Sequence, residues 1–261
     1  MKKHAYLIMA HGNWNILEKL LLLLDDERND IYLHIDAKVK CDISRFESLL
    51  KFSKLNVLDS TNVYWADYPI VQCELNLLKV ANDCGDYSYY HLLSGVDLPL
   101  KSNNEIFNFF EESRKEFIGI VPTETYYSVR RVKFYHLFTC LKCYRNSKLL
   151  KGIDRIIEYG QKLCKVNRLK NFNWRIIDGW KWFSITERYC KYLLANEALI
   201  KKVFSKTISC DELVLQTLAY NSSFYDSLYD VTDLKNGSMR FIDWKRGKPY
   251  TWGSVRQTLM S

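Results

Sequence analysis

Short apolar runs alternate with helix-like segments over the first half of the chain. The runs predict strands at 4–9, 31–36, 55–58, 87–93 and 117–121. Helices are predicted between them at 13–24, after the capping-box pattern Ser44-x-x-Glu47, at 69–81 behind Pro69, and after Ser102-x-x-Glu105. This alternation predicts an α/β fold with a mainly parallel central sheet flanked by helices.

The pattern is less regular in the second half. Residues 126–178 are basic and aromatic and predict one helix at 149–164. A strand at 182–185, helices at 187–204 and 209–220, and a last strand at 239–244 are predicted after it. Because no linker interrupts these segments, we expect a single domain over residues 1–261.

Composition narrows the class of protein. Hydrophobic residues make up 48% of the chain, which is enough for a full core. The net charge of +8 favours anionic partners, but Lys and Arg are scattered among acids, so we expect no nucleic-acid partner. The longest purely apolar stretch, 20–24, is far shorter than a membrane span. No signal peptide or disulfide framework is recognisable, so we expect a cytoplasmic protein.

Polar residues follow three of the predicted strands. His11 and Gly12 follow the first, Asp36 ends the second, and the segment Ser94-Gly95-Val96-Asp97 follows the fourth. In a parallel sheet these positions meet at one edge, where nucleotides bind. Taken singly, His11 could be a turn residue, and either aspartate could cap a helix or turn.

The segment Ser209-Cys210-Asp211-Glu212 has two interpretations. It matches a capping box, in which Glu212 would bond to the start of a helix. Alternatively, Glu212 is a general base that takes a proton from an attacking sugar hydroxyl. An inverting sugar transfer needs one such base, because the displacement takes place in a single step.

A departing diphosphate would need stabilisation of its negative charge. The chain contains no Asp-x-Asp motif that would hold a divalent metal beside it. Basic side chains near the C-terminus could replace the metal; these are Arg240, Lys245, Arg246, Lys248 and Arg256. The alternative is that they form a solvated basic face.

Several segments together resemble the Core-2/I-branching β-1,6-N-acetylglucosaminyltransferase family. They are AYLIMAHGN, LHIDAK, YHLLSGVDLPLKSNNEI, GWKWFSIT, SCDELVLQTL and RFIDWKRGKPY, and they span nearly the whole chain. The resemblance implies a GT-A-like nucleotide-sugar-binding fold that works without metal or other cofactor. It also implies inverting transfer from a UDP-sugar, usually UDP-N-acetylglucosamine, to a sugar hydroxyl.

The resemblance assigns roles to individual residues. The family's catalytic base falls on Glu212. Residues expected to contact the nucleotide sugar are His11, Gly12, Asp36, Ser94, Gly95, Asp97, Arg240, Lys245, Arg246 and Arg256. Residues expected to contact the acceptor are Glu124, Arg130, Arg131, Trp182 and Trp244. Residues 1–121 would be the nucleotide-binding half, and 122–261 the acceptor-binding and catalytic half.

The chain also departs from the family pattern. Cys210 replaces the usual proline, and we expect the chain to lack the membrane anchor and the paired cysteines of extracellular-type members. The chain stops at Ser261 before the family's Phe-Ala-x-Lys-Phe-like segment, so we expect a C-terminal truncation.

We therefore expect an enzyme of surface polysaccharide biosynthesis. Its acceptor would be a glycan or a lipid-linked oligosaccharide, and the basic, aromatic segment 126–168 could contact the inner face of the plasma membrane. The alternatives are transfer of xylose or another sugar from its UDP derivative, and a non-catalytic nucleotide- or carbohydrate-binding protein.

Overall fold

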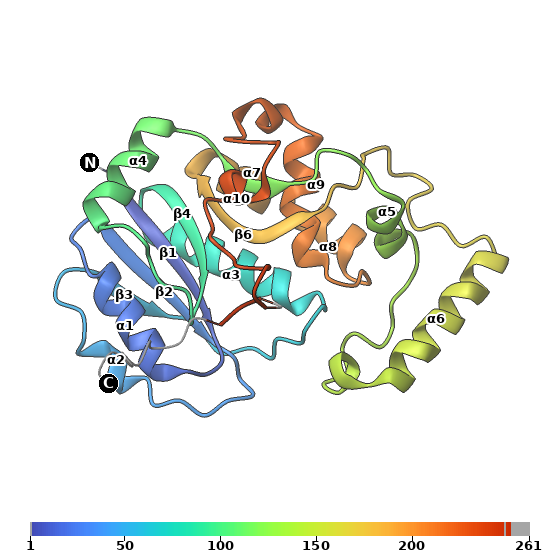
Figure 1. The fold of residues 1–261 in the computed structure, drawn as a ribbon, viewed down its shortest axis with the longest axis horizontal. Helices are drawn as coiled ribbons and strands as arrows, with labels where there is room; N and C mark the ends of the chain where they lie inside the picture. The colour runs from blue at the N-terminus through green and yellow to red at the C-terminus, as the bar shows by residue number, and fades with distance from the viewer. Residues whose placement is uncertain (1, 248, 252–261) are drawn as a thin grey trace, which may run out of the picture.

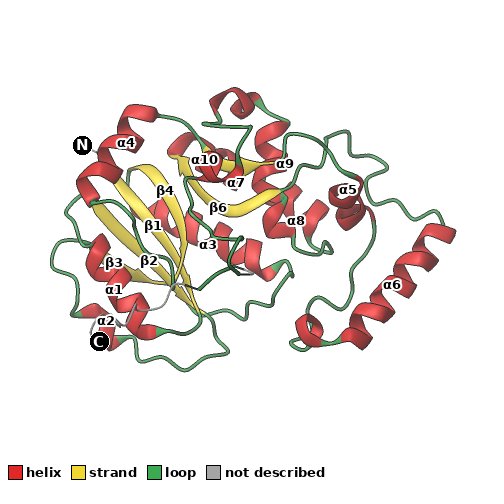
Figure 2. Ribbon diagram, in the orientation of Figure 1, coloured by secondary structure: helices red, strands yellow, loops and turns green. Residues whose placement is uncertain are grey.

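The apolar runs form strands of a six-stranded sheet, whose arrangement is drawn in Figures 1 and 2. The computed structural model describes residues 2–247 and 249–251. The strands are β1 (Lys3–Ala10), β2 (Asn29–Ile35), β3 (Lys54–Val57), β4 (Tyr87–Ser94), β5 (Phe117–Ile120) and β6 (Gly179–Thr186), in the order β3-β2-β1-β4-β6-β5. β1 pairs in parallel with β2 and β4, and β2 with β3. β6 lies antiparallel between β4 and β5, so the sheet is mainly parallel, as predicted.

Helices cover both faces of the sheet. The α-helices are α1 (Trp14–Leu24), α2 (Ser44–Glu47), α3 (Pro69–Cys84), α4 (Asn103–Ser113), α5 (Tyr126–Lys133), α6 (Lys148–Leu163), α7 (Glu187–Ala195), α8 (Glu197–Phe204), α9 (Val214–Tyr220) and α10 (Leu234–Ser238). Single 3₁₀ turns are η1 (Tyr144–Asn146), η2 (Cys210–Glu212) and η3 (Ser223–Ser227). Among the described residues, no helix is both long and apolar enough to cross a bilayer.

The alternation of side chains along β1 separates two cores. Ala5 and Leu7 belong to the larger core, which includes α3 and α7. Tyr6 and Ile8 face the other way, into the core that α1 and α2 cover. Successive residues of a strand point to opposite faces of the sheet, so both faces of β1 must be apolar.

Two local predictions about helices were wrong. The backbone N–H and hydroxyl of Ser44 both bond to Asp42, so Ser44 does not cap α2, which is a single turn. The predicted helix 187–204 divides into α7 and α8 at Asn196, whose side chain bonds to the carbonyl of Tyr192 at 2.8 Å. In contrast, Pro69 begins α3, and the Ser102–Glu105 capping box is formed.

The predicted strand at 239–244 is also wrong. Residues 240–244 have no regular structure, and Met239 before them adopts a left-handed conformation with φ of 52°. A left-handed residue turns the chain out of the extended geometry that a strand requires. Helix α5 was not predicted, although the Thr125–Ser128 capping box begins it.

Candidate active site

The carboxyl edge of the parallel strands brings the predicted nucleotide-side residues together. His11 and Gly12 follow β1, Asp36 follows β2, and Ser94 ends β4. The N–H of Asp36 donates to the carbonyl of Ala10 at 2.9 Å, which ties the first two of these loops together. A side chain on Gly95 would come within 2.8 Å of Ala10, so only glycine allows the third loop to pass this close.

Both aspartates of this edge are engaged by their own loops. The Asp36 carboxylate is 2.5 Å from the ammonium of Lys38, which also donates to the carbonyl of Val63. The Asp97 carboxylate accepts the N–H of Ser94 at 2.7 Å and closes the turn after β4. Within residues 2–247 and 249–251, no three His, Cys, Asp or Glu side chains are grouped to hold a metal ion.

Glu212 lies in the turn η2, which begins at a strained residue. Ser209 has a left-handed backbone with φ of 48°, and its N–H donates to the carbonyl of Ala66 at 2.8 Å. Ala66 is also left-handed, with φ of 63°. Non-glycine residues in this region cost free energy and are common at functional sites. The Ser209 side chain makes no capping bond, so the capping-box interpretation of Glu212 is wrong.

Arg131 positions the Glu212 carboxylate. It comes from α5, is buried, and donates from Nη2 to Glu212 Oε2 at 2.9 Å. The same guanidinium donates to the carbonyls of Ile208 and Ser209, so it also fixes the loop that carries the glutamate. The Glu212 side chain is nonetheless 48% exposed. An arginine bound in this way orients the carboxylate and still leaves it accessible to a ligand.

The surroundings of Glu212 raise its pKa. Burial of part of the carboxyl is the main cause, and the nearby acids Asp211 and Asp178 add to it, while Arg131 opposes it. A raised pKa makes a carboxylate a stronger proton acceptor, as general-base catalysis requires.

A buried group of charges lies behind this turn. Lys181 of β6 has its ammonium 3.2 Å from Glu74 of α3 and 3.8 Å from Asp211. Burial raises the pKa of Glu74 to about 8, although Lys181 acts in the opposite direction. This group links the residue next to Glu212 to the sheet. This group was not predicted from the sequence; the lysine within the apolar strand GWKWFSIT was the available signal, since a buried lysine needs a partner.

Arg240 bridges β4 and β6. Its guanidinium donates to the carbonyls of Leu92 in β4 and Phe183 in β6, at 3.2 and 2.8 Å, and to the hydroxyl of Ser184 at 3.2 Å. Burial lowers its pKa. The structure thus places this predicted diphosphate ligand against backbone carbonyls at the junction of β4 and β6.

The other predicted diphosphate ligands follow in the next loop. Asp243 accepts the backbone N–H groups of Lys245 and Arg246, and its second oxygen is 2.5 Å from Arg246 Nε. Lys248 and Arg256 lie outside the described residues.

The predicted acceptor-side residues have separate environments. Glu124 accepts the N–H of Ile176 at 2.6 Å, and Arg130 makes a two-pronged ion pair with Glu158 of α6 at 2.5 and 2.6 Å. Trp182 packs against the larger core, and Trp244 is exposed. Of this set, the structure brings only Arg131 into contact with Glu212.

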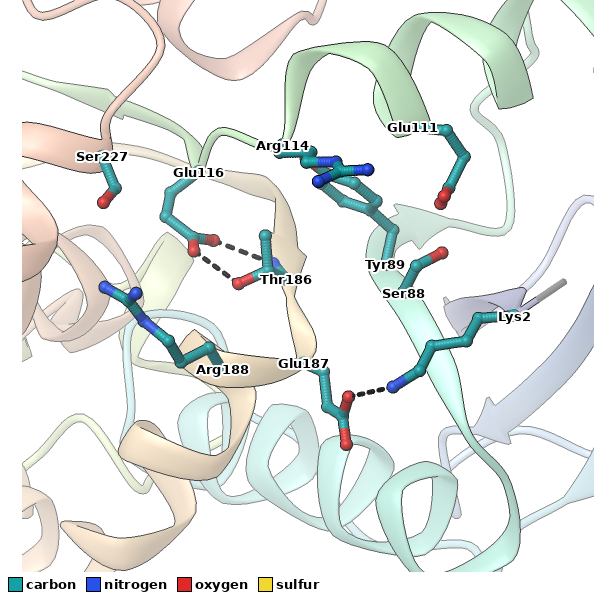
Figure 3. Close-up of a pocket in the computed structure, with 10 residues that line it drawn as sticks. All are labelled: Lys2, Ser88, Tyr89, Glu111, Arg114, Glu116, Thr186, Glu187, Arg188 and Ser227. Carbon is teal, nitrogen blue, oxygen red and sulfur yellow. Dashed lines mark hydrogen bonds and ion pairs between the residues drawn. The ribbon is translucent and has the colours of Figure 1, made fainter.

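The opposite edge of the sheet also has a cavity, of about 390 Å³ (Figure 3). Glu116 there bonds to the N–H and hydroxyl of Thr186, and Lys2 pairs with Glu187. These groups already satisfy one another, and the cavity lies away from the loops that follow the parallel strands.

Comparisons with known proteins give matches that cover nearly the whole chain. The family model described as "Branch: Core-2/I-Branching enzyme" matches residues 4–258. The chain is 24% identical to the β-1,3-galactosyl-O-glycosyl-glycoprotein β-1,6-N-acetylglucosaminyltransferases of Homo sapiens and Bos taurus, over 94% and 96% of its own length. It spans 58% and 59% of those two proteins.

A solved structure gives a weaker likeness. The crystal structure of S. aureus TarS in complex with UDP-GlcNAc is 12% identical, with a TM-score of 0.33. The match covers 44% of this chain and 33% of the other. A likeness of this extent supports no conclusion about the fold or the site.

Proposed function

The chain belongs to the Core-2/I-branching enzyme family, and from this premise we propose that it is an inverting, metal-independent glycosyltransferase. It moves a sugar from a UDP-sugar to a hydroxyl of a glycan acceptor, and we propose N-acetylglucosamine as that sugar. The observation that carries the proposal is the half-exposed Glu212 carboxylate, held by Arg131 and with a raised pKa.

In this proposal Glu212 is the general base. The acceptor oxygen attacks the anomeric carbon while its proton passes to the Glu212 carboxylate, which becomes a carboxylic acid. The bond between the anomeric carbon and the UDP oxygen breaks in the same step, so the configuration inverts. Arg131 is a positioning residue, because its bonds to Ile208, Ser209 and Glu212 fix the direction of the carboxylate.

The UDP leaving group carries away the electron pair of the broken bond. We propose that side-chain cations stabilise it, with Arg240, Lys245, Arg246 and Arg256 as the predicted ligands. His11, Gly12, Asp36, Ser94, Gly95 and Asp97 would surround the nucleotide sugar. Glu124, Arg130, Arg131, Trp182 and Trp244 remain predictions for the acceptor side.

The pathway is a further part of the proposal. A cytoplasmic enzyme of surface polysaccharide biosynthesis would use a glycan or lipid-linked oligosaccharide acceptor at the inner face of the plasma membrane. The basic character of residues 126–168 supports a peripheral membrane contact.

The direct test is a donor panel without added metal. Thermal shift with UDP-N-acetylglucosamine, UDP-xylose, UDP-glucose and UDP-galactose identifies the donor, and release of UDP from each reports turnover. We expect the largest shift and the fastest release with UDP-N-acetylglucosamine. Preference for UDP-xylose would change the donor but keep the mechanism. Calorimetric UDP binding without turnover, even with an acceptor, would contradict the enzyme and favour a binding protein.

A further inference from the structure

Helix α6 is amphipathic, but one row of its apolar side chains faces outward. It lies at the end of the molecule farthest from the N-terminal strands (Figure 1). Its only buried residues are two acids, Asp154 and Glu158. Leu149, Ile156 and Leu163 are 73%, 71% and 68% exposed. A helix packed on a globular protein normally shows the reverse arrangement.

One ion pair and several hydrogen bonds fix which side of α6 faces the protein. Glu158 receives two hydrogen bonds from Arg130, and Asp154 lies 2.8 Å from His136 Nδ1. The amide of Gln161 also bonds to the backbone N–H and carbonyl of Tyr135. Rotating the helix to bury its apolar side would expose these pairs and break them. The outward direction of the apolar row is therefore a property of the folded chain.

The exposed side of α6 carries a repeated basic and apolar pair. Leu149, Ile156 and Leu163 are spaced by seven residues and so lie in one row along the helix. The residue before each is basic: Lys148, Arg155 and Lys162 form a parallel row beside the apolar one. Lys162 also pairs with Glu158 at 3.1 Å.

The charge around this helix is of one sign. Between residues 141 and 170, the only acids are Asp154 and Glu158, and both face inward. The basic residues of the same stretch are Lys142, Arg145, Lys148, Lys151, Arg155, Lys162, Lys165, Arg168 and Lys170. Two copies of such a surface would repel each other, so a second copy of this chain fits it poorly. An anionic partner with an apolar interior fits both rows.

We propose that this outward face, formed by Lys148, Leu149, Arg155, Ile156, Lys162 and Leu163, docks on a bilayer of anionic phospholipid. The apolar row enters the boundary between headgroups and acyl chains, and the basic row contacts the lipid phosphates. A helix lying in the plane of the interface can use both rows at once.

The docking surface is connected to the candidate active site. Arg130 binds Glu158 of α6, while its neighbour Arg131 binds Glu212. A membrane bound through α6 would therefore lie on the side from which α5 approaches the carboxylate. This docking surface deepens the peripheral membrane contact of the proposed function and rests on that proposal; vesicle binding without substrates can be measured independently of sugar transfer.

The test is sedimentation of the full chain with vesicles, without substrates. Vesicles of equal parts phosphatidylglycerol and phosphatidylcholine should bind the protein, and pure phosphatidylcholine should bind it at least tenfold more weakly. Replacing Leu149 and Ile156 by serine should reduce binding about tenfold or more. Replacing Lys148 and Arg155 by glutamine should reduce it about fivefold for each charge removed.

A matched control uses exposed leucines of another helix. Leu22→Ser with Leu23→Ser changes two residues of α1 that are 53% and 49% exposed, and should leave vesicle binding unchanged. Circular dichroism and UDP-sugar turnover on a soluble acceptor should be the same in all variants. Equal binding to neutral vesicles, or full binding by the Leu149/Ile156 variant, would overturn the proposal. A dimer that this variant converts to a monomer would assign the surface to a second copy instead.

Discussion

The two edges of the sheet each hold a glutamate with a raised pKa, and only one is suited to chemistry. Glu116, at the amino edge, is 2% exposed, and both of its oxygens bond to Thr186, the residue that caps α7 (Figure 3). Glu212, at the carboxyl edge, is nearly half exposed and is held by a buried arginine. Burial is the leading cause of both shifts. A raised pKa therefore marks a catalytic candidate only where the carboxylate remains accessible beside a ligand-binding edge.

The largest expected effect follows from removing the proposed base, Glu212. Glu212→Gln keeps the shape of the side chain but cannot take up a proton, so transfer should fall about 100- to 10,000-fold. UDP binding, measured by calorimetry, should be unchanged. The matched change at the other edge, Glu116→Gln, should leave kcat unchanged. Full activity of Glu212→Gln would remove the mechanism.

The pH dependence of Arg131→Gln tests whether this arginine sets the pKa of Glu212. Arg131 lowers the pKa of Glu212, so the loss of its charge should raise that pKa further. The base must be ionised to act, so the acidic limb of the kcat/KM profile should move to higher pH. The lost charged hydrogen bond should also reduce activity on the order of tenfold. A reduced rate with an unmoved acidic limb would show that Arg131 acts only on the loop.

A smaller effect is expected at the amino edge, on stability rather than rate. Glu116→Ala removes both acceptors of Thr186 and should lower the free energy of unfolding by about 2 kcal/mol. Urea denaturation measures this, and kcat per folded molecule should be unchanged. A loss of kcat without a loss of stability would mean that the cavity in Figure 3 takes part in the reaction.

Stability should also depend on pH through Glu116. Its pKa is raised in the folded chain, so its ionisation disfavours folding. Its favourable contribution is complete below the unfolded pKa and is lost as the pH rises through the folded value. Glutamine does not titrate, so across this interval the free energy of unfolding of the natural chain should fall with rising pH relative to that of Glu116→Gln. Urea denaturation at several pH values measures the difference.

The sequence predicted the fold where local pattern and tertiary structure agree. β1, β2 and β4 are buried over most of their length on both faces, and Pro69 and Ser102 mark helix starts by backbone chemistry that depends on few neighbours. The prediction of a strand at 239–244 was wrong because it used only the pattern of neighbouring residues. The conformation of Arg240 is instead fixed by carbonyls of β4 and β6, which are distant in the chain.

The site was predicted only in part, for a related reason. Glu212 was recognisable from the segment around it, but its partner Arg131 is 81 residues away. The buried Glu74 and Lys181 likewise come from different elements. Sequence patterns show residue types and spacing, and they do not show which distant ions the fold pairs. The same limit applies to α6, whose strong amphipathic pattern predicts a helix but not that one row of its apolar side chains faces outward.

The last prediction, that metal ions do not affect the rate of transfer, tests the carboxyl edge as a whole. The carboxylates that follow β2 and β4 are bound by Lys38 and by the backbone of Ser94, so using them as metal ligands would break those loops. Transfer should therefore proceed at the same rate after treatment with EDTA, and added Mn²⁺ should not increase it. A titration of the rate against Mn²⁺ checks this directly. Strict dependence on the ion would mean that these acids rearrange around it, and that side-chain cations do not neutralise the departing diphosphate.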